Sequence, residues 1–445
     1  MPMSVAPRIS DETTLDPLEA ARFFLKNLRE PAHILVAISG GSDSTGLLLA
    51  LRAVLSCEQN PGTRLSAVTI DHALRPESAD EAKKVAALCA ELGVPHFIRR
   101  WDDPKPPTGL SEASRLARYR LIADVADTIG ADAVVTGHTL GDQRETIAMR
   151  VARSDRHDNI GLAGMADAVL FDRRLWVLRP FLACERQPIR NFILAQGKDW
   201  VDDPSNESIK YERVRVRQSL GRTPLADYNK TSVARTALSL AAAEFLRANV
   251  QVFHSVLAKV NISTGSEECP EFRHALAALI ATLGGRAYFP AASGMDRAIE
   301  PIVEGRSGRL TLGRVLVDRT RDGLYLYRER RNLPEICLEA GESAIWDDRF
   351  FVENGSTNEV RITSSFPNAA SPPFSLNIPP GVVRQAIWSM PTAVTASSDE
   401  AFDTRAIKFV PQVAPFDLFL PRFDLELANA IAVLLGRSAY PQPPV

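Results

Sequence analysis

The sequence lacks the features of a secreted, zinc-stabilised or membrane-spanning protein. It has 445 residues and only five cysteines, which are widely scattered, form no C-x-x-C pair and have no histidine nearby in zinc-finger spacing. Its amino terminus has no basic stretch followed by an apolar one, and no uninterrupted apolar run approaches the roughly 20 residues that span a bilayer. We therefore expect a soluble, cytoplasmic protein without membrane contact, whose thiols are reduced and mostly buried.

Strong overall charge and internal repetition are also missing. The net charge of −2 argues against a protein that is basic over its whole surface, and an apolar content of 45% is enough for substantial cores. Positive charge is concentrated locally, because residues 173–222 hold 11 Lys and Arg against 6 Asp and Glu, and residues 306–331 hold 8 against 3. These two basic segments predict a polyanion held at defined places, with ordinary solvated faces as the alternative.

The first half of the chain alternates between segments of strand character and segments of helix character. Strand character is found at residues 34–38, 65–71, 94–101 and 132–137, and helix character at residues 45–56, 79–92, 111–130 and from about residue 142. Strands and helices of these lengths predict right-handed crossovers and a doubly wound parallel sheet covered on both faces. The fold class that we expect is thus α/β.

The pattern changes twice farther along the chain. From about residue 222 helical patterns dominate, with long helices expected at residues 232–260 and 271–284, followed by a basic, β-prone segment at residues 309–331. Beyond about residue 335 the chain is rich in prolines and short strands. We expect an α/β domain at residues 1–222, a helical, basic domain at 223–335 and a small mixed α/β domain at 336–445.

Unusual polar residues follow three of the expected strands. Ligands of open α/β sheets bind outside the carboxyl ends of the strands, which is where these residues fall. The polar groups are the loop Ser39-Gly40-Gly41-Ser42-Asp43-Ser44 after the first strand, Asp71 and His72 after the second, and Gly137 and His138 after the fourth, with Asp142 and Glu145 on the next helix. We expect these strand ends to form one site.

The glycine loop has the composition of an anion site. It opens a helix, so unpaired backbone N–H groups and the helix dipole favour a phosphate, which two glycines let approach and three serine hydroxyls can contact. No lysine completes a Walker pattern. Asp43 would repel a bare phosphate, so we expect a Mg²⁺ ion between the two. A capped helix after a tight turn is the alternative for such a loop.

The order S-G-G-S-D-S resembles the pyrophosphate loop (PP-loop) of the ATP pyrophosphatases, which cleave ATP between its α and β phosphates. Further motifs narrow the resemblance: TIDHALR, GLSEASRLARY, GHTLGDQRET, GLAGM, RPFL, VDDPSN and RVRVR within residues 30–220, and TLGRVLVDR and WDDRF as fainter matches beyond. Together they resemble the tRNA(Ile)-lysidine synthases. The resemblance implies an adenine nucleotide alpha hydrolase-like fold for the first domain.

The same resemblance implies an ATP- and Mg²⁺-dependent ligation of L-lysine to the wobble cytidine of the tRNA(Ile) that carries a CAU anticodon. Members of the family adenylate O2 of the cytosine with release of pyrophosphate, after which the ε-amine of lysine attacks C2 and displaces AMP. The expected partners are therefore tRNA(Ile) and free lysine. Whether the chain acts as a homodimer is left open.

Roles for the strand-end residues also follow from the resemblance. The loop, Asp71 and His72 would bind ATP, and Asp43 would be the metal ligand. His138 could contact the nucleotide phosphate or the developing charge, and Arg118 could neutralise the transferring phosphoryl group. A core or capping histidine and an exposed helical arginine are the competing interpretations.

Asp142 and Glu145 lie three residues apart, so on a helix they share a face. They could bind the lysine or a metal and accept a proton from the attacking amine, which must be neutral although its ordinary pKa is near 10.4. Helix capping and surface charge are the alternatives for this pair.

Alternating arginines in the first basic segment would share one face of a strand and could track a phosphate backbone. In the second basic segment, Tyr325 and Tyr327 are interleaved with arginines and could stack on RNA bases. We expect tRNA contacts from four arginines: Arg213, Arg215, Arg217 and Arg314.

Three features depart from the family pattern. Gly141 stands where the family usually has an acid and Thr139 where it often has a second histidine, so neither is given a site role. Residues 154–160 replace a short glycine-rich turn and are longer. Local RNA contacts are therefore less predictable than the chemistry.

Two other functions fit parts of the sequence. A PP-loop tRNA thiolase would need a sulfur-carrying cysteine or cluster ligands, and no cysteine lies in the strand-end motifs. A non-catalytic RNA-binding relative would keep the fold, but the presence of Ser39, Asp43, His138 and Asp142 argues against it.

Overall fold

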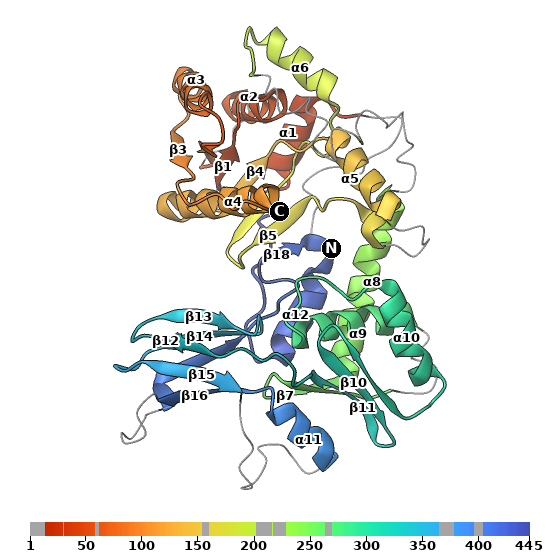
Figure 1. Ribbon diagram of the computed structural model, residues 1–445. Helices are drawn as coiled ribbons and strands as arrows, with labels where there is room; N and C mark the ends of the chain where they lie inside the picture. The colour runs from red at the N-terminus through yellow and green to blue at the C-terminus, as the bar shows by residue number, and fades with distance from the viewer. Residues whose placement is uncertain are drawn as a thin grey trace. The chain divides into compact units, whose positions relative to one another are not determined.

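The structure is a computed structural model that describes residues 14–29, 31–57, 62–153, 160–201, 216, 228–262, 269–364, 378–395 and 404–445. The chain forms two compact units, one of Met1–Arg235 with Pro441–Val445 and one of Thr236–Tyr440, whose helices and strands are labelled in Figure 1. Within the described ranges, no helix is both long and apolar enough to cross a membrane.

The first unit is built on the expected parallel sheet. Its strands are β1 (His33–Ala37), β2 (Arg64–Asp71), β3 (His96–Arg100), β4 (Ala133–Thr136), β5 (Ala168–Phe171) and β6 (Leu175–Leu178). Within this unit they run in the order β5-β6-β4-β1-β2-β3, and every pair from β6 to β3 is parallel. The predicted α/β fold class is confirmed.

Burial on both faces explains why the central strands are uniformly apolar. Ile34, Leu35 and Val36 of β1 and Val134 and Val135 of β4 are all fully buried, which is the pattern of a parallel sheet covered by helices. Only β5 runs against its neighbour, as a hairpin with β6. A tight turn with positive φ at both Asp172 and Arg173 makes that hairpin possible.

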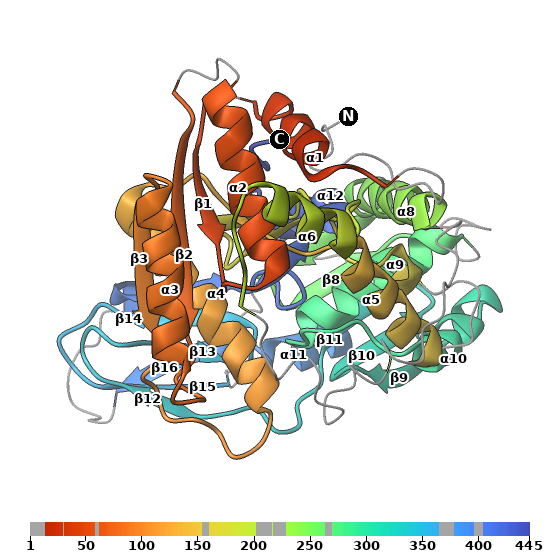
Figure 2. The same cartoon turned by 90° about the horizontal axis from the view of Figure 1, so that it is seen from above.

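The helices of this unit connect and cover the strands. They are α1 (Pro17–Lys26), α2 (Ser42–Cys57), α3 (Ser78–Glu91), α4 (Leu110–Ile129), α5 (Leu140–Arg153) and α6 (Arg186–Ala195), with a short 3-10 turn η1 (Ile160–Ala163). Helix α1 has no counterpart among the expected elements, although Asp16 and Glu19 form a capping box at its start. Helices α1 and α6 both pack against α2 (Figure 2).

The first long helix expected beyond residue 222 starts in the first unit, ends in the second, and is shorter than expected. Helix α8 (Tyr228–Asn249) ends where the chain turns into the hairpin β7 (Val250–Phe253) and β8 (Leu257–Val260), so the single helix expected at residues 232–260 is wrong in its second half. Alternating valines in VQVF favour a strand. His254 and Ser255 supply the positive φ of a two-residue turn, and pairing of β8 with β11 (Gly323–Arg328) overrides the helical periodicity.

The basic segment forms the β-structure that its pattern predicts. Strands β9 (Gly308–Leu312) and β10 (Val315–Thr320) join β11 in an antiparallel sheet of order β7-β8-β11-β10-β9. Helices α9 (Pro270–Leu283) and α10 (Ala292–Val303) precede it. Helix α9 contacts β11, the central strand.

Short strands follow, as expected from the proline-rich sequence. Strands β12 (Ile336–Leu338), β15 (Val360–Ser364) and β16 (Pro391–Thr395) form one antiparallel sheet, and β13 (Ser343–Trp346), β14 (Phe350–Asn354) and β17 (Ile407–Pro411) form another. The remaining elements are α11 (Pro380–Ile387), β18 (Phe419–Pro421), α12 (Leu425–Leu434) and the 3-10 turns η4 (Thr404–Ala406) and η5 (Arg422–Asp424).

One apolar core joins these pieces of the second unit. Tyr325 and Tyr327 from β11 pack in the same buried cluster as Trp346 and Phe350 from the β13–β14 hairpin. The core therefore continues across residue 335, where we expected a boundary. The three domain ranges remain predictions.

Candidate active site

The glycine loop is held in shape by one of its own serines. Ser44 Oγ accepts a hydrogen bond of 3.2 Å from Ser39 N and donates one of 3.1 Å to Gly41 O. Gly40 has a φ of +86°, a conformation that side chains with a Cβ rarely adopt. The first-turn N–H groups of α2 have no partner within the helix, so this shaped loop presents donors at a helix amino terminus.

Gly137 brings the end of β4 against the loop. A Cβ at this position would lie 2.7 Å from Ser44 N and 2.8 Å from both Asp43 C and Asp43 O. Only glycine permits this close approach of backbone to backbone. The ends of β1 and β4 are thus in direct contact, as the topology predicts for neighbouring parallel strands.

A second segment is anchored to the same loop. Val201 N, at the start of the VDDPSN motif, donates a 2.8 Å hydrogen bond to Gly40 O. The side chain of Val201 also lies 3.5 Å from the position that a Cβ on Gly40 would take. The chain that leads into the first cluster of alternating arginines therefore starts at the glycine loop.

Asp43 is paired with an arginine that the sequence did not single out. Arg186, the first residue of α6, donates through Nε to Asp43 Oδ1 and Oδ2 at 3.2 and 3.0 Å, and through Nη2 to Oδ2 at 2.8 Å. Ser42 Oγ donates a further hydrogen bond of 3.0 Å to Oδ1. Both oxygens of Asp43, the expected metal ligand, therefore accept hydrogen bonds from side chains of this chain.

The two acids of α5 belong to the same electrostatic site. Burial lowers the pKa of Arg186, but the hydrogen bond to Asp43 and the negative charges of Asp43, Asp142 and Glu145 outweigh it and hold the pKa above its ordinary value. Glu145 is buried in this environment, with 3% of its surface exposed. Asp43 is thus in direct contact with this guanidinium group, and the charges of Asp142 and Glu145 act on it without a direct contact.

Asp142 also performs the structural role that was its alternative interpretation. Its Oδ2 accepts hydrogen bonds from Thr139 N at 2.9 Å and Thr139 Oγ1 at 3.0 Å. Thr139 stands where the family often has a second histidine, and it is buried. Thr139 is the N-cap residue of α5, and its backbone carbonyl accepts a hydrogen bond of 3.2 Å from Gln143 N. This cap fixes where the α5 acids point.

His138 is oriented by the strand that it follows. Its Nδ1 lies 2.8 Å from Thr136 Oγ1 at the end of β4, and the ring is partly exposed. A hydrogen bond at Nδ1 fixes the ring plane, and with it the direction of Nε2. The sequence predicted that His138 lies at this edge of the sheet, but it did not predict the hydrogen bond with Thr136.

Asp71 and His72 contribute to the site in different ways. Asp71 Oδ1 accepts from Ala73 N at 2.8 Å and from Ser78 Oγ at 2.6 Å, which holds the turn between β2 and α3. Arg118 Nε, from α4, donates to His72 Nε2 at 3.2 Å. Burial and the charge of Arg118 lower the pKa of His72 to about 4, against the opposing charge of Asp71.

A neutral His72 whose Nε2 accepts a hydrogen bond must carry its proton on Nδ1. Among the described residues that Nδ1 has no hydrogen-bond partner, although it is buried. The ring of Trp101 lies edge-on at a centroid distance of 6.1 Å. The end of β2 thus offers a buried donor beside an aromatic ring.

The GLAGM motif is held by side chains that were not predicted. Gln143 of α5 clamps Met165 from both sides, because its Nε2 donates to Met165 O at 3.0 Å and its Oε1 accepts from Met165 N at 2.7 Å. Arg150 donates to Gly161 O at 2.6 Å and to Gly164 O at 2.7 Å. Helix α5 therefore carries the two acids, and its Gln143 and Arg150 hold the loop of the GLAGM motif in place.

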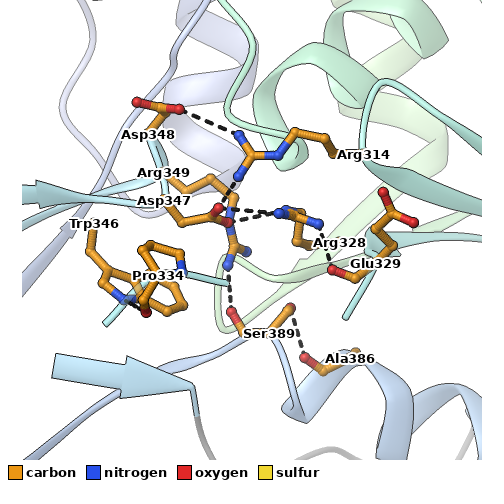
Figure 3. Close-up of polar contacts among 10 residues, drawn as sticks. All are labelled: Arg314, Arg328, Glu329, Pro334, Trp346, Asp347, Asp348, Arg349, Ala386 and Ser389. Carbon is orange, nitrogen blue, oxygen red and sulfur yellow. Dashed lines mark hydrogen bonds and ion pairs between the residues drawn. The ribbon is translucent and has the colours of Figure 1, made fainter. Parts of the chain in front are cut away.

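Of the four arginines predicted to contact tRNA, the structure describes only Arg314. Arg213, Arg215 and Arg217 lie outside the described residues. Arg314 sits in the β9–β10 turn, where its guanidinium pairs with Asp347 and, at 3.3 Å, with Asp348 (Figure 3). Stacking of Tyr325 and Tyr327 on RNA is wrong for this structure, because both side chains are fully buried in the central strand β11.

Much of the second basic segment is neutralised within its own unit. Asp347 also pairs with the buried Arg328 and Arg349, at 3.1 and 2.6 Å (Figure 3). Arg309 pairs with Asp318 at 2.6 Å. The excess of positive charge in the sequence thus overstates the charge that this surface presents.

The described residues hold no group of three or more His, Cys, Asp or Glu side chains arranged around a common metal position. Mg²⁺ is commonly bound by one or two carboxylates together with substrate phosphates and water. Asp43, at the start of the helix that the loop opens, is placed for that arrangement.

Comparison with known proteins shows the family of the chain. Residues 16–223 match the PP-loop domain family, which defines the class of the first unit. A tRNA(Ile)-lysidine synthase of Rhizobium meliloti (strain 1021) is 41% identical over 443 residues, covering 96% of this chain and 97% of the relative.

Two further relatives have the same description. The tRNA(Ile)-lysidine synthase of Mesorhizobium japonicum is 36% identical and covers 92% of this chain and 93% of the relative. That of Brucella melitensis biotype 2 is also 36% identical, with coverages of 91% and 95%. The chain belongs to the tRNA(Ile)-lysidine synthase family.

Proposed function

We propose that this chain is an ATP-dependent ligase that forms lysidine on tRNA(Ile). It joins L-lysine to C2 of the wobble cytidine of a CAU anticodon, through an adenylated cytidine, and releases pyrophosphate and AMP. The single observation that carries the proposal is the glycine loop at the start of α2, with Gly137 of β4 against its backbone and Asp43 at its end, in a chain of this family.

The glycine loop would bind the phosphates of ATP. Hydrogen bonds of Ser44 fix the shape of the loop, and Gly40 adopts the positive φ that this shape requires. The N–H groups of the loop lie at the amino terminus of α2. Asp43 would hold Mg²⁺ between itself and the phosphates, and the ion would offset the charge that develops on the leaving pyrophosphate. Ser39 and Ser42 have hydroxyls on the same loop.

The buried Nδ1–H of His72 is suited to a ring nitrogen of adenine. A neutral imidazole can donate there at any pH well above its depressed pKa of about 4. Asp71 supports this contact by holding the turn, and Arg118 supports it by bonding Nε2. Arg118 would also face the transferring phosphoryl group, which lies at the same edge of the sheet.

The acids of α5 would receive the lysine. An ammonium group is attracted by Asp142 and Glu145, and a buried carboxylate can take its proton when the amine becomes the nucleophile. The Thr139 cap keeps Asp142 in place for this task. His138, fixed by Thr136, would contact the phosphate or the charge that develops on the base.

The tRNA would be held by the segment that starts at Val201. That residue is bonded to the loop, and arginines that could track a phosphate backbone follow it 12 to 16 residues later in the sequence. This proposal concerns Arg213, Arg215 and Arg217. Arg314 would contribute only after exchanging its aspartate partners for a phosphate.

A thiolase is disfavoured by the thiols of the first unit. Burial raises the pKa of Cys89 to about 11, and burial with the charges of Asp16 and Glu19 raises that of Cys184 to about 12. Neither is a thiolate near neutral pH, and a thiolate is the form that carries sulfur. Cys57 is exposed, but it ends α2, on the far end of the helix from the glycine loop.

Incorporation of labelled L-lysine into a CAU-anticodon tRNA(Ile) transcript tests the proposal. With ATP and Mg²⁺ present, we expect label in this transcript and none in the same transcript with the anticodon cytidine changed to uridine. Cleavage of ATP to AMP and pyrophosphate that depends on RNA, without lysine incorporation, would keep adenylation but reject lysine as the nucleophile.

A further inference from the structure

The contact between Arg186 and Asp43 uses both oxygens of the carboxylate. Nε lies 3.0 to 3.2 Å from the two oxygens and Nη2 lies 2.8 Å from Oδ2. A Mg²⁺ ion needs a carboxylate oxygen at about 2.0–2.1 Å in near-octahedral geometry. The guanidinium on both oxygens and Ser42 Oγ on Oδ1 use three of the roughly four lone-pair sites of this carboxylate, so they compete with an ion for its oxygens.

We propose that Arg186 and the divalent cation compete for Asp43. Arg186 is the counter-ion of this carboxylate in this structure, and it moves aside when a divalent cation binds Asp43. The inference rests on the proposed function in one respect, the role of Asp43 as a metal ligand. It adds a positioning residue that controls how readily the metal binds.

The side chains of Arg186 and Asp43 are exposed enough for their ion pair to open and close. The side chains of Arg186 and Asp43 are 37% and 17% exposed, so either can be solvated when they separate. A fully buried pair would leave an uncompensated charge on separation, and would resist exchange.

The guanidinium of Arg186 has acidic surroundings besides Asp43. The negative charges of Asp142 and Glu145 act on the same guanidinium, so it stays in an acidic environment after leaving Asp43. Arg186 therefore stays in a negative potential when a cation takes its place at Asp43.

A fixed contact from Arg186 to a phosphate would have the opposite consequence. In that case removing the guanidinium would weaken binding of metal and nucleotide together. In the competition that we propose, removing it strengthens binding of the metal. The sign of the change separates the two roles without reference to turnover.

The test measures Mn²⁺ affinity, from the electron paramagnetic resonance signal of the free ion, in the presence of a non-hydrolysable ATP analogue. We expect Arg186→Gln to bind Mn²⁺ about five to ten times more tightly than the wild type, because one half-exposed charge-assisted contact no longer competes. Arg186→Lys, which keeps the charge but not the two-oxygen geometry, should fall between them. Thermal unfolding of each variant checks that it is folded.

Arg190→Gln is the matched control. Arg190 lies one turn later on α6, where its guanidinium stacks over Trp200 at 5.2 Å, so its loss removes the same charge from the same helix without touching Asp43. We expect its Mn²⁺ affinity to stay within twofold of the wild type. An equal gain in this variant would reduce the effect to general electrostatics and overturn the proposal.

Asp43→Ala, alone and combined with Arg186→Gln, completes the design. We expect weak Mn²⁺ binding in both, with no further effect of position 186. If Asp43→Ala weakens binding while Arg186→Gln leaves it unchanged or weaker, the competition alone is refuted. If Asp43→Ala binds Mn²⁺ like the wild type, Asp43 is not a metal ligand, and that part of the proposed function fails as well.

Discussion

Two aspartates of this chain are each held by arginines, and they differ in burial as expected if Asp43 has the chemical role that we propose and Asp347 a structural one. Asp43, at the glycine loop of the first unit, has one half-exposed partner, Arg186. Asp347, in the β13–β14 turn of the second unit, has three partners, of which Arg328 and Arg349 are almost fully buried (Figure 3).

The two environments differ in what happens when a partner is lost. Separation of Asp43 from its arginine exposes both to water and to other acids, so the carboxylate is available to a ligand. Loss of Asp347 would leave buried guanidinium groups without a counter-charge, which is costly. Arg349 is tied further to Ser389 O at 2.6 Å, so Asp347 links the β10–β11 hairpin, the β13–β14 turn and the end of α11.

The largest effect on activity is expected from a substitution of Asp43. Asp43→Ala should reduce tRNA-dependent pyrophosphate release by about 10³-fold or more, because charge on the phosphates is no longer offset. Its affinity for tRNA should stay within a few fold, since RNA phosphates bind elsewhere. Filter binding and pyrophosphate release measure the two quantities. Asp80→Ala, another acid in a first helical turn, is the control and should change neither.

At Asp347 the expected effect is on folding. Asp347→Asn should lower the free energy of unfolding of the second unit by about 3 to 5 kcal/mol, because buried cations lose their partner. Asp348→Asn is the matched control, since Asp348 pairs with Arg314 at 3.3 Å but is 72% exposed, and its loss should cost about 0.5 kcal/mol. Urea unfolding distinguishes them, and equal losses would refute the structural role of Asp347.

A smaller effect is expected where the loop touches β4. Gly137→Ala would push Asp43 and Ser44 away from the strand, because its Cβ meets their backbone at 2.7–2.8 Å. We expect a loss of about 10²-fold in turnover from a displacement of this kind, with tRNA affinity retained. Gly141→Ala, whose Cβ would lie 3.6 Å from Thr139 Oγ1, should be within threefold of the wild type.

The smallest effect concerns pH and His72. The folded chain protonates His72 only near its depressed pKa of about 4, whereas the unfolded chain protonates it below about 6.5. Stability from this residue is therefore present above pH 6.5 and falls as the pH drops toward 4. Between pH 7.5 and pH 5 we expect a loss of about 1 to 2 kcal/mol that His72→Gln removes.

His254→Asn serves as the control for that experiment. His254 has positive φ in the β7–β8 turn, a conformation that asparagine tolerates. This variant should keep the pH dependence of the wild type in urea unfolding. Wild-type behaviour in His72→Gln would instead show that another group causes the pH dependence.

The sequence predicted the sheet better than it predicted the side-chain contacts at its edge. Because parallel strands share one edge for their carboxyl ends, topology alone predicts that Asp43, Asp71 and His138 lie along the same edge. Arg186 could not be found in this way, because it is one of 11 basic residues in its segment and follows no pattern. Its importance comes from where α6 begins in space.

Two sequence-based expectations failed for physical reasons that lie outside local pattern. The helix expected at residues 232–260 yields to strand pairing, since β8 gains a partner in β11 that periodicity does not reveal. Tyr325 and Tyr327 alternate with leucine as in a half-exposed strand, yet β11 is central in its sheet and both residues are buried. Position in the sheet decided exposure.

Pyrophosphate release per folded molecule, compared between Asp43→Ala and Asp347→Asn, tests the central claim most directly. At a temperature low enough for both variants to be folded, we predict that Asp347→Asn keeps turnover within a few fold of the wild type while Asp43→Ala, with wild-type stability, has almost none. A folded but inactive Asp347→Asn, or an active Asp43→Ala, would contradict the division between a chemical and a structural aspartate.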